Sequence, residues 1–354
     1  MIGIKQYIIE TDKLRKNIAQ IKNYVKVPVI GVVKGNGYGL GLIPYAFFLK
    51  ENGVETLAVA DYLEALALAE NEFSNILLLT PQTDPFILMR LISQNIRLTV
   101  GNVENLKIIA ALAIQEKAVV HIKIDTGFGR FGFNYKDISE ISKAFHFDNV
   151  KIEAVYSHFS SSFEKDYKIT RQQNERFKAI YNQFKEFGIY AHIANSCAAL
   201  RFPSTRFDAV RIGSAFLGRL PIIPPIKLHK IGYLKTTVIS SSTVNKGENI
   251  GYGNRFKAKS TISTAVVEVG YKDGFDIKKA EEPYKLLDVL KYVYNDIKAY
   301  HKRLYLYENK NEVLGRVGMY STTILNKNGL KPNDEIKVSV SPLYVDSQIK
   351  REYI

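Results

Sequence analysis

Short apolar runs alternate with stretches of helical periodicity through the first 213 residues of this 354-residue chain. Helix-period segments such as 62–70, 103–115 and 172–186 separate the runs. The runs number eight and occupy residues 29–33, 56–60, 76–79, 96–100, 119–124, 152–157, 191–195 and 209–213. Strands that alternate with helices form parallel sheets, and eight such units close into a barrel. The sequence therefore predicts an α/β fold that begins with a (β/α)8 TIM barrel.

The chain changes character near residue 220. Pro221, Pro224 and Pro225 crowd one short segment, which is typical of a domain junction. Beyond it, turns rather than helices separate four further strand-like runs, at 234–243, 260–269, 314–325 and 335–340. We predict a barrel domain over residues 1–219 and a mainly-β domain over residues 220–354. We expect roughly the first ten residues to pack with the second domain.

One segment of the second domain departs from the β pattern. Residues 281–303 place Leu286, Leu287, Leu290 and Tyr294 at helical spacing. We therefore predict a helical insertion at about 280–303.

Composition narrows the class of protein. Hydrophobic residues make up 46% of the chain and charged residues 24%, as in soluble globular proteins. Cys197 is the single cysteine, which excludes an internal disulfide framework and fits a reducing cytoplasm. No segment has the roughly 18 apolar residues of a membrane span, and the N-terminus lacks a signal-peptide core. We expect a cytoplasmic protein without membrane contact.

The net charge of +14 raises the question of nucleic-acid binding. The lysines are spread along the chain, and no zinc-ligand spacing, basic helix or aromatic RNA-binding signature appears. We therefore expect neither a nucleic-acid partner nor a metal site. A basic surface does attract anionic metabolites.

Residues 32–41 read Val-Val-Lys-Gly-Asn-Gly-Tyr-Gly-Leu-Gly, so a buried strand delivers Lys34 into a glycine-rich turn. A lysine in such surroundings can have a lowered pKa and form a Schiff base with a carbonyl. The glycines allow the backbone to approach a bulky anion closely. The alternative is a surface lysine beside an ordinary turn.

The C-terminal ends of barrel strands build the active site in this type of fold. The residues at these ends are cationic, hydroxylic or small: Lys34 after the first strand, Lys123 and Arg130 at the fifth, His158 at the sixth, Asn195 and Ser196 at the seventh, and Arg211, Gly213 and Ser214 at the eighth. An anion with an aromatic ring and a reactive carbonyl suits this set.

Eight segments that occur in order along the chain carry a resemblance to a known family. They are VVKGNGYGLG, HIKIDTGFGRFGF, YSHFSS, HIANSCAALRFP, DAVRIGSAFLG, GENIGYGNRF, VEVGYKDGF and LGRVGMYS. The chain resembles the alanine racemase family, the barrel-type (fold type III) enzymes that use pyridoxal 5'-phosphate (PLP). The resemblance implies PLP as cofactor, a small amino acid as substrate, interconversion of L- and D-alanine, and a homodimer with shared active sites.

The resemblance also implies two catalytic bases. Racemisation removes a proton from one face of the substrate Cα and returns a proton to the other face, so one base on each face is needed. Lys34 matches the lysine that holds PLP and then acts as a base. Tyr252, in Gly251-Tyr252-Gly253, matches the tyrosine that the partner subunit supplies.

Further residues match the family's cofactor site. Arg211 resembles the arginine that faces the pyridine nitrogen; because arginine keeps its proton, it leaves that nitrogen unprotonated and limits transamination. His158 resembles the imidazole beside the ring. The phosphate cradle and its surroundings match Tyr38, Asn195, Ser196, Gly213 and Ser214.

Three residues match positions close to the substrate. Arg130 resembles the arginine near the cofactor's phenolic oxygen and the substrate carboxylate, and Met319 the residue whose backbone amide meets that carboxylate. Lys123 aligns with a lysine that is carbamylated in several members. A plain lysine or a bound chloride nearby are alternatives to the carbamate.

The chain departs from the family pattern at the expected substrate entrance. Tyr320 stands where the family has an aspartate, and the insertion at 280–303 lengthens the chain before Met319. A changed entrance leaves open a racemase of serine or of a basic amino acid. A catalytically silent PLP-binding protein is a further alternative. A barrel-type decarboxylase is disfavoured because Cys197 lies in the barrel half.

Overall fold

The computed structural model describes residues 5–114, 117–277, 289–290, 292–294, 304–308 and 310–354. The chain divides into two compact units, one over Thr11–Ile231 and one that combines Met1–Glu10 with Gly232–Ile354. The division falls later than the predicted boundary at residue 219. Hydrogen bonds explain the difference, because Asn17 Nδ2 donates to the carbonyls of Phe216 and His229 and so ties the following segment to the barrel.

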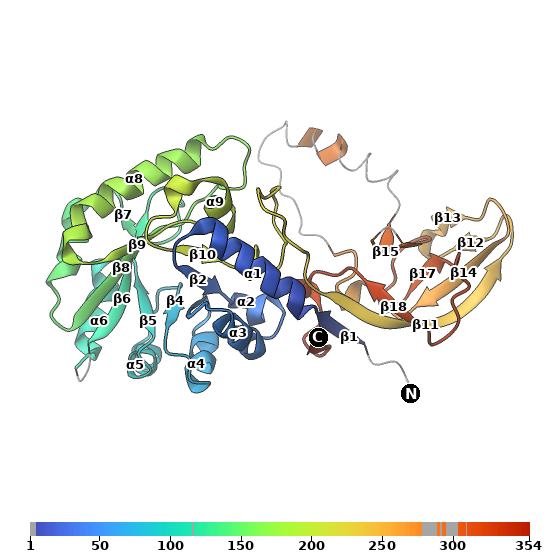
Figure 1. Ribbon diagram of the computed structural model, residues 1–354, viewed down its shortest axis with the longest axis horizontal. Coiled ribbons are helices and arrows are strands. Elements are labelled where there is room, and N and C mark those ends of the chain that lie inside the picture. The colour runs from blue at the N-terminus through green and yellow to red at the C-terminus, as the bar shows by residue number, and fades with distance from the viewer. Residues whose placement is uncertain (1–4, 115–116, 278–288, 291, 295–303, 309) are drawn as a thin grey trace. The chain divides into compact units, whose positions relative to one another are not determined.

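Eight parallel strands form the core of the first unit (Figure 1). They are β2 (Val29–Val32), β3 (Thr56–Val59), β4 (Ile76–Leu78), β5 (Arg97–Val100), β6 (Ala118–Asp125), β8 (Val150–Tyr156), β9 (Tyr190–His192) and β10 (Val210–Ile212). From β2 to β9 each strand pairs with the next, β10 pairs with β2, and a single bridge between His192 and Ala209 joins β9 to the segment before β10. The predicted (β/α)8 barrel is confirmed, with strand ends shifted by at most three residues.

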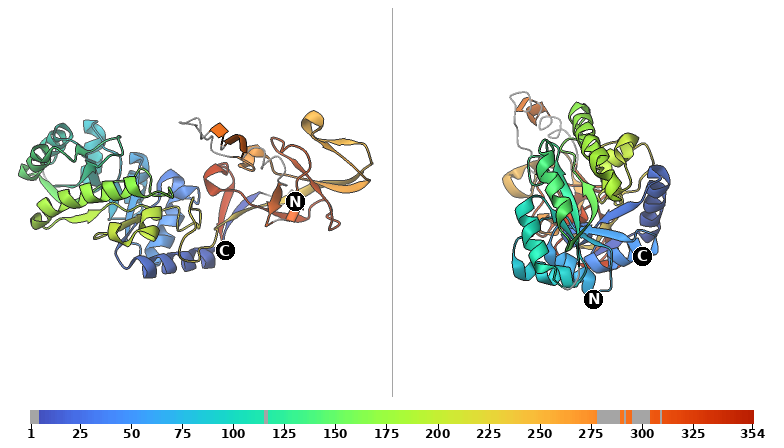
Figure 2. Two further views of the ribbon diagram at one scale, coloured as in Figure 1. Left: turned by 90° about the horizontal axis from the view of Figure 1, so that it is seen from above. Right: turned by 90° about the vertical axis from the view of Figure 1, so that its left-hand side faces the viewer.

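Helices lie outside this ring (Figures 1 and 2). Their bounds are α1 (Thr11–Val25), α3 (Leu42–Glu51), α4 (Tyr62–Glu70), α5 (Pro85–Ser93), α6 (Val103–Leu112), α7 (Ile138–Lys143), α8 (Lys168–Phe184) and α9 (Ser196–Arg201). The segment labelled α2 (Lys34–Tyr38) is a left-handed turn rather than a regular helix. Side chains of Asp61, Asp84 and Asn102 accept backbone N–H groups at the starts of α4, α5 and α6, which explains where these helices begin. None of the helices in the described ranges is long and apolar enough to cross a membrane.

The barrel interior is filled rather than hollow. Ile30, Val32, Ala58, Leu77 and Ala209 form one buried cluster contributed by neighbouring strands. Such layers of branched side chains make the inside of a barrel a packed core and leave its strand ends to form the site.

The second unit is built on one six-stranded sheet. Its order is β17 (Thr322–Leu325), β14 (Ile262–Val267), β11 (Tyr233–Val244), β1 (Gln6–Ile9) and β19 (Lys350–Tyr353), and β18 (Glu335–Val338) also pairs with β11. The N-terminal strand β1 therefore belongs to this unit. Short hairpins add β12 (Asn249–Ile250) with β13 (Phe256–Lys257) and β15 (Tyr305–Tyr307) with β16 (Lys310–Glu312), and β7 (Phe133–Asn134) pairs with β6 in the barrel.

The predictions for the second unit included a strand at 314–325 and a helical insertion at 280–303. The predicted strand at 314–325 was wrong over its first part, because Gly315 adopts φ +75° and begins a turn that lasts until β17. The predicted insertion at 280–303 lies mostly outside the described residues. Within it, residues 289–290 and 292–294 are described and helical.

Candidate active site

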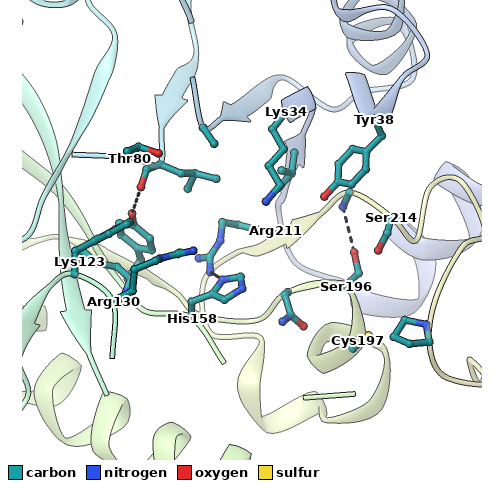
Figure 3. A pocket seen from close by; sticks show the side chains of 18 residues that line it. Lys34, Tyr38, Thr80, Lys123, Arg130, His158, Ser196, Cys197, Arg211 and Ser214 are labelled. Carbon is teal, nitrogen blue, oxygen red and sulfur yellow. Dashed lines mark hydrogen bonds between the residues drawn. The ribbon is translucent and has the colours of Figure 1, made fainter. Parts of the chain in front are cut away.

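A cavity of about 520 Å³ opens at the C-terminal ends of the barrel strands (Figure 3). Ten of the predicted site residues line it: Lys34, Tyr38, Lys123, Arg130, His158, Asn195, Ser196, Arg211, Gly213 and Ser214. Four of these side chains are lysines or arginines, and no carboxylate is found among the described residues that line the cavity. The cavity therefore favours an anionic ligand.

Lys34 is delivered into the cavity by a left-handed turn. Residues 35–39 all have φ between +53° and +83°. An L-residue in this conformation costs roughly 1–2 kcal/mol, which explains the glycines at 35, 37 and 39. Asn36 is held there because its N–H donates to Glu64 Oε1 at 2.7 Å and its Oδ1 accepts from Leu42 N–H at 2.8 Å.

Tyr38, Ser196 and Gly213 meet at one end of the cavity. A Cβ atom on Gly213 would lie 2.5 Å from Tyr38 Oη, so the close approach of this ring requires glycine. Ser196 Oγ accepts from the Gly213 N–H at 3.1 Å. Burial raises the pKa of Tyr38 to about 12, so its hydroxyl stays protonated and can donate to an anion.

Arg211 lies at the back of the cavity and is almost fully buried. Its Nη2 donates to the Ser157 carbonyl at 2.6 Å and lies 3.2 Å from His158 Nδ1. Burial lowers the pKa of Arg211 to about 10, so the guanidinium remains charged at neutral pH. Burial and the charge of Arg211 hold the pKa of His158 well below its usual value, and His158 is therefore neutral.

Two cations of the cavity contact aromatic rings. The Arg130 guanidinium lies 4.6 Å from the ring centroid of Phe128 and 4.7 Å from that of Phe131. Buried Lys123 donates to the Ile124 carbonyl at 2.8 Å and lies 5.6 Å from the Tyr156 centroid. The two rings near Arg130 attract its guanidinium and favour positions of this side chain close to them.

The electrostatic surroundings of Lys34 favour a neutral amine. Desolvation by the cavity walls and the charges of Arg130 and Arg211 lower its pKa, whereas Glu64 opposes them. A neutral amine is the form that attacks an aldehyde.

Sequence profiles of known families match both units of the chain. Residues 9–221 match the profile described as alanine racemase, N-terminal domain, and residues 231–341 match alanine racemase, C-terminal domain. The chain belongs to the alanine racemase family.

Individual members of this family agree with that assignment. The alanine racemase of Clostridium tetani is 35% identical over 279 residues, which cover 75% of this chain and 72% of that protein. The alanine racemase of Desulforamulus reducens is 34% identical over 280 residues, covering 75% and 76%. Among solved structures, the alanine racemase of Clostridium difficile 630 superposes with a TM-score of 0.84 at 24% identity, covering 100% of this chain and 96% of that chain. This last similarity establishes the fold.

Alanine racemase family enzymes use pyridoxal phosphate, and the cavity fits this group. Lys34 offers an amine for its aldehyde. The hydroxyls of Tyr38 and Ser214, which both line the cavity, offer donors for a phosphate. Arg211 would supply a buried hydrogen-bonding cation to this group at the back of the cavity.

Two predicted site residues belong to the other unit and do not line this cavity. Tyr252 lies in a short 3-10 turn, Tyr252–Asn254, between Gly251 at φ +76° and Gly253 at φ +66°, and its side chain is 74% exposed. Met319 is also exposed, and its carbonyl accepts from the Lys272 N–H at 3.1 Å. Their predicted roles therefore stay predictions.

Four polar residues that were not among the predicted site residues support the cavity from outside its lining. Glu64 holds the Lys34 turn, and His121, His192 and Glu153 form a buried network with Arg211. A signal existed for the histidines, because each interrupts an apolar strand where an unpaired polar group would be costly. Glu64 carried no such signal, since it lies on an amphipathic helix.

Proposed function

We propose that this chain interconverts L- and D-alanine with pyridoxal phosphate, using Lys34 and the Tyr252 of a partner copy as its two bases. The observation that carries the proposal is the convergence of Lys34, Arg130 and Arg211 in one cavity of a member of the alanine racemase family. The relatives at 34–35% identity bear the name alanine racemase.

In this proposal the residues divide the work of moving one proton. When bound, pyridoxal phosphate draws electrons from the substrate Cα and makes its proton more acidic. The neutral Lys34 amine exchanges a proton with one face of Cα, and Tyr252 exchanges a proton with the other face. Arg130, whose guanidinium lies close to the Phe128 and Phe131 rings, and the backbone amide of Met319 bind the substrate carboxylate.

Arg211 would control which reaction follows. An arginine at the ring nitrogen donates a hydrogen bond without giving up its proton. The ring then withdraws electrons less strongly, which favours return of the proton to Cα over transfer of the amino group to the cofactor. Tyr38, Asn195, Ser196, Gly213 and Ser214 would hold the phosphate and its surroundings, and His158 would pack beside the ring.

Chiral analysis of a substrate panel tests the proposal. Purified protein with added cofactor is incubated with L-alanine, L-serine, L-lysine and L-arginine, and the D-isomers are quantified. We expect D-alanine to form fastest and the Lys34→Ala variant to form none. Faster turnover of serine or of a basic amino acid would reject alanine as the substrate. Cofactor binding without any turnover would instead identify a silent PLP-binding protein.

A further inference from the structure

A chain of buried hydrogen bonds runs from the cavity through the barrel interior. Arg211 Nη1 on β10 contacts His192 Nδ1 on β9. His192 Nε2 lies 3.1 Å from His121 Nδ1 on β6, and His121 Nε2 lies 3.1 Å from Glu153 Oε2 on β8. Glu153 Oε2 also accepts from Arg97 Nε on β5 at 2.6 Å. Both histidines are fully buried.

The chemistry of the two ends determines the direction of every bond between them. A guanidinium only donates, so His192 must accept at Nδ1 and carry its proton on Nε2. That proton points at His121 Nδ1, so His121 in turn carries its proton on Nε2 and donates to Glu153. Each histidine is then neutral, with one donor and one acceptor in use.

The charges around this network agree with that order. Burial and the charge of Arg211 hold the pKa of His192 well below its usual value. Burial also lowers the pKa of His121, although Glu153 opposes this effect. Burial raises the pKa of Glu153, but hydrogen bonds from His121 and Arg97 outweigh it and bring the pKa to about 2. The network therefore ends in an anion.

We propose that Glu153 is a positioning residue for the racemase: through His121 and His192 it holds the Arg211 guanidinium in its place in the cavity. This inference rests on the proposed function, because Arg211 is the group assigned there to the cofactor ring nitrogen. The other acceptors of Arg211 Nη1 and Nη2 include the carbonyls of His192, Ser157 and Ile193, which the strands fix. The Nδ1 of His192 is an acceptor only while the proton order of the network is kept.

Loss of Glu153 would disturb that order at its far end. His121 Nε2–H would lose its carboxylate acceptor, and a proton moved to His121 Nδ1 would face His192 Nε2–H. His192 would then have to carry its proton on Nδ1, directed at Arg211. The Tyr190 hydroxyl lies 3.3 Å from His121 Nε2 and could replace the lost acceptor, so the test removes it as well.

The first experiment needs no variant. Nitrogen-15 NMR of histidine-labelled protein without cofactor reports which ring nitrogen carries the proton. We expect neutral Nε2–H tautomers for both His121 and His192, with no titration between about pH 5.5 and 8.5. A proton on Nδ1 of His192, or a charged ring, would overturn the proposal whether or not the protein racemises alanine.

The second experiment compares four proteins with the wild type: Glu153→Leu combined with Tyr190→Phe, Tyr190→Phe alone, Glu153→Gln, and Lys151→Gln as a matched control on the exposed face of the same strand. The readout is pyruvate released per alanine racemised, because pyruvate forms when the amino group stays on the cofactor. We expect the double variant to raise this ratio by about tenfold or more. The three other variants should stay close to wild type, since the side-chain amide oxygen introduced by Glu153→Gln still accepts from His121.

The outcomes separate the two levels of the proposal. An unchanged ratio in a folded double variant rejects the positioning role of Glu153. Absence of racemisation in the wild type rejects the proposed function, while the tautomers still test the hydrogen-bond order. A thermal unfolding scan shows whether the double variant folds. If it does not fold, Glu153→Gln alone decides the question. A shifted His192 tautomer or a raised pyruvate ratio in Glu153→Gln would then reject the proposed role of residue 153 as the acceptor for His121 Nε2–H.

Discussion

Single residues in the cavity are tuned by their burial. Lys123 is the clearest example, since its ammonium group has a carbonyl and two aromatic rings as neighbours but no carboxylate hydrogen bond in the described structure. Burial and the charges of Arg211 and Arg130 lower its pKa to about 7, against the opposing effect of Asp125. Near neutral pH a large fraction of this amine is neutral, which is also the form that a carbamate requires. Whether it is carbamylated stays a prediction.

The lowered pKa of Lys123 predicts a pH-dependent stability. Between about pH 7 and 10.5 the folded lysine is neutral while the unfolded lysine is charged. The unfolded state therefore binds more protons, and the free energy of unfolding rises with pH in this window. We expect wild type to gain roughly 1 kcal/mol per pH unit relative to Lys123→Met. Urea unfolding of both proteins at pH 7 and 9, without cofactor, measures this gain, and parallel curves would contradict it.

The ring pair around Arg130 predicts a binding defect. Phe131→Leu removes one of the two rings that lie close to the guanidinium, and cation–π contacts contribute about 0.5–2 kcal/mol. We expect KM for alanine to rise by about threefold or more, with a smaller change in kcat. Steady-state kinetics test this, and Phe145→Leu, outside the cavity on a ring stack with Phe184, serves as the control. An equal KM in Phe131→Leu and wild type would show that the contact between Arg130 and the Phe131 ring does not contribute to substrate binding.

At the scale of elements, one helix supports the conformation of a neighbouring turn. The left-handed turn after β2 makes several backbone hydrogen bonds of its own, but the Asn36 N–H has no acceptor among them. Residues 36 and 38 also adopt positive φ without being glycine. Helix α4 supplies the missing partner through Glu64, which accepts the Asn36 N–H. The direction of Lys34 thus depends on the packing of two elements.

This dependence predicts an effect of α4 on cofactor binding. Glu64→Ala leaves the Asn36 N–H without its acceptor, and we expect a loss of about 1–3 kcal/mol in the free energy of unfolding together with weaker PLP binding. Glu64→Gln keeps an acceptor oxygen and should lose less. Glu70→Ala on the same helix removes only a distant, exposed ion pair with Arg90 and should change stability by less than about 0.5 kcal/mol. Urea unfolding and absorbance titration with PLP test all three variants. Equal effects of Glu64→Ala and Glu70→Ala would show that Glu64 does not stabilise the Lys34 turn.

At the scale of the whole molecule, the two predicted bases belong to different compact units. Lys34 lies in the barrel unit and Tyr252 in the sheet unit. The proposed homodimer assigns each active site a Lys34 from one copy and a Tyr252 from the other. This assignment makes the smallest active assembly a dimer.

Mixed dimers test this arrangement directly. Lys34→Ala and Tyr252→Phe are each expected to lower racemisation by at least about a hundredfold. In a mixed dimer of the two variants, one site combines an intact Lys34 with an intact Tyr252, so activity should return to about half the wild-type value. Co-expression with two affinity tags isolates the mixed dimer. No recovery in the mixed dimer would show that both bases come from one copy.

Much of the fold was readable from local patterns. The eight strands of the barrel were predicted to within three residues, because buried parallel strands are short apolar runs bounded by polar or glycine residues. The predicted strand at 314–325 was wrong over its first part, because an apolar stretch does not reveal that Gly315 adopts a positive φ that changes the direction of the chain. Nine of the ten predicted residues that line the cavity were found because strand ends converge in a barrel, and Tyr38 was found through the family resemblance.

By itself, the order of residues determined the barrel, the family and the lysine that enters the cavity, because each depends on periodicity or on a contiguous motif. Tertiary structure alone decided that Glu64 holds the Lys34 turn and that Glu153 reaches Arg211 through two histidines. These contacts join side chains from strands and helices far apart in the chain. Their partners are set by strand register and barrel closure, which no local pattern encodes.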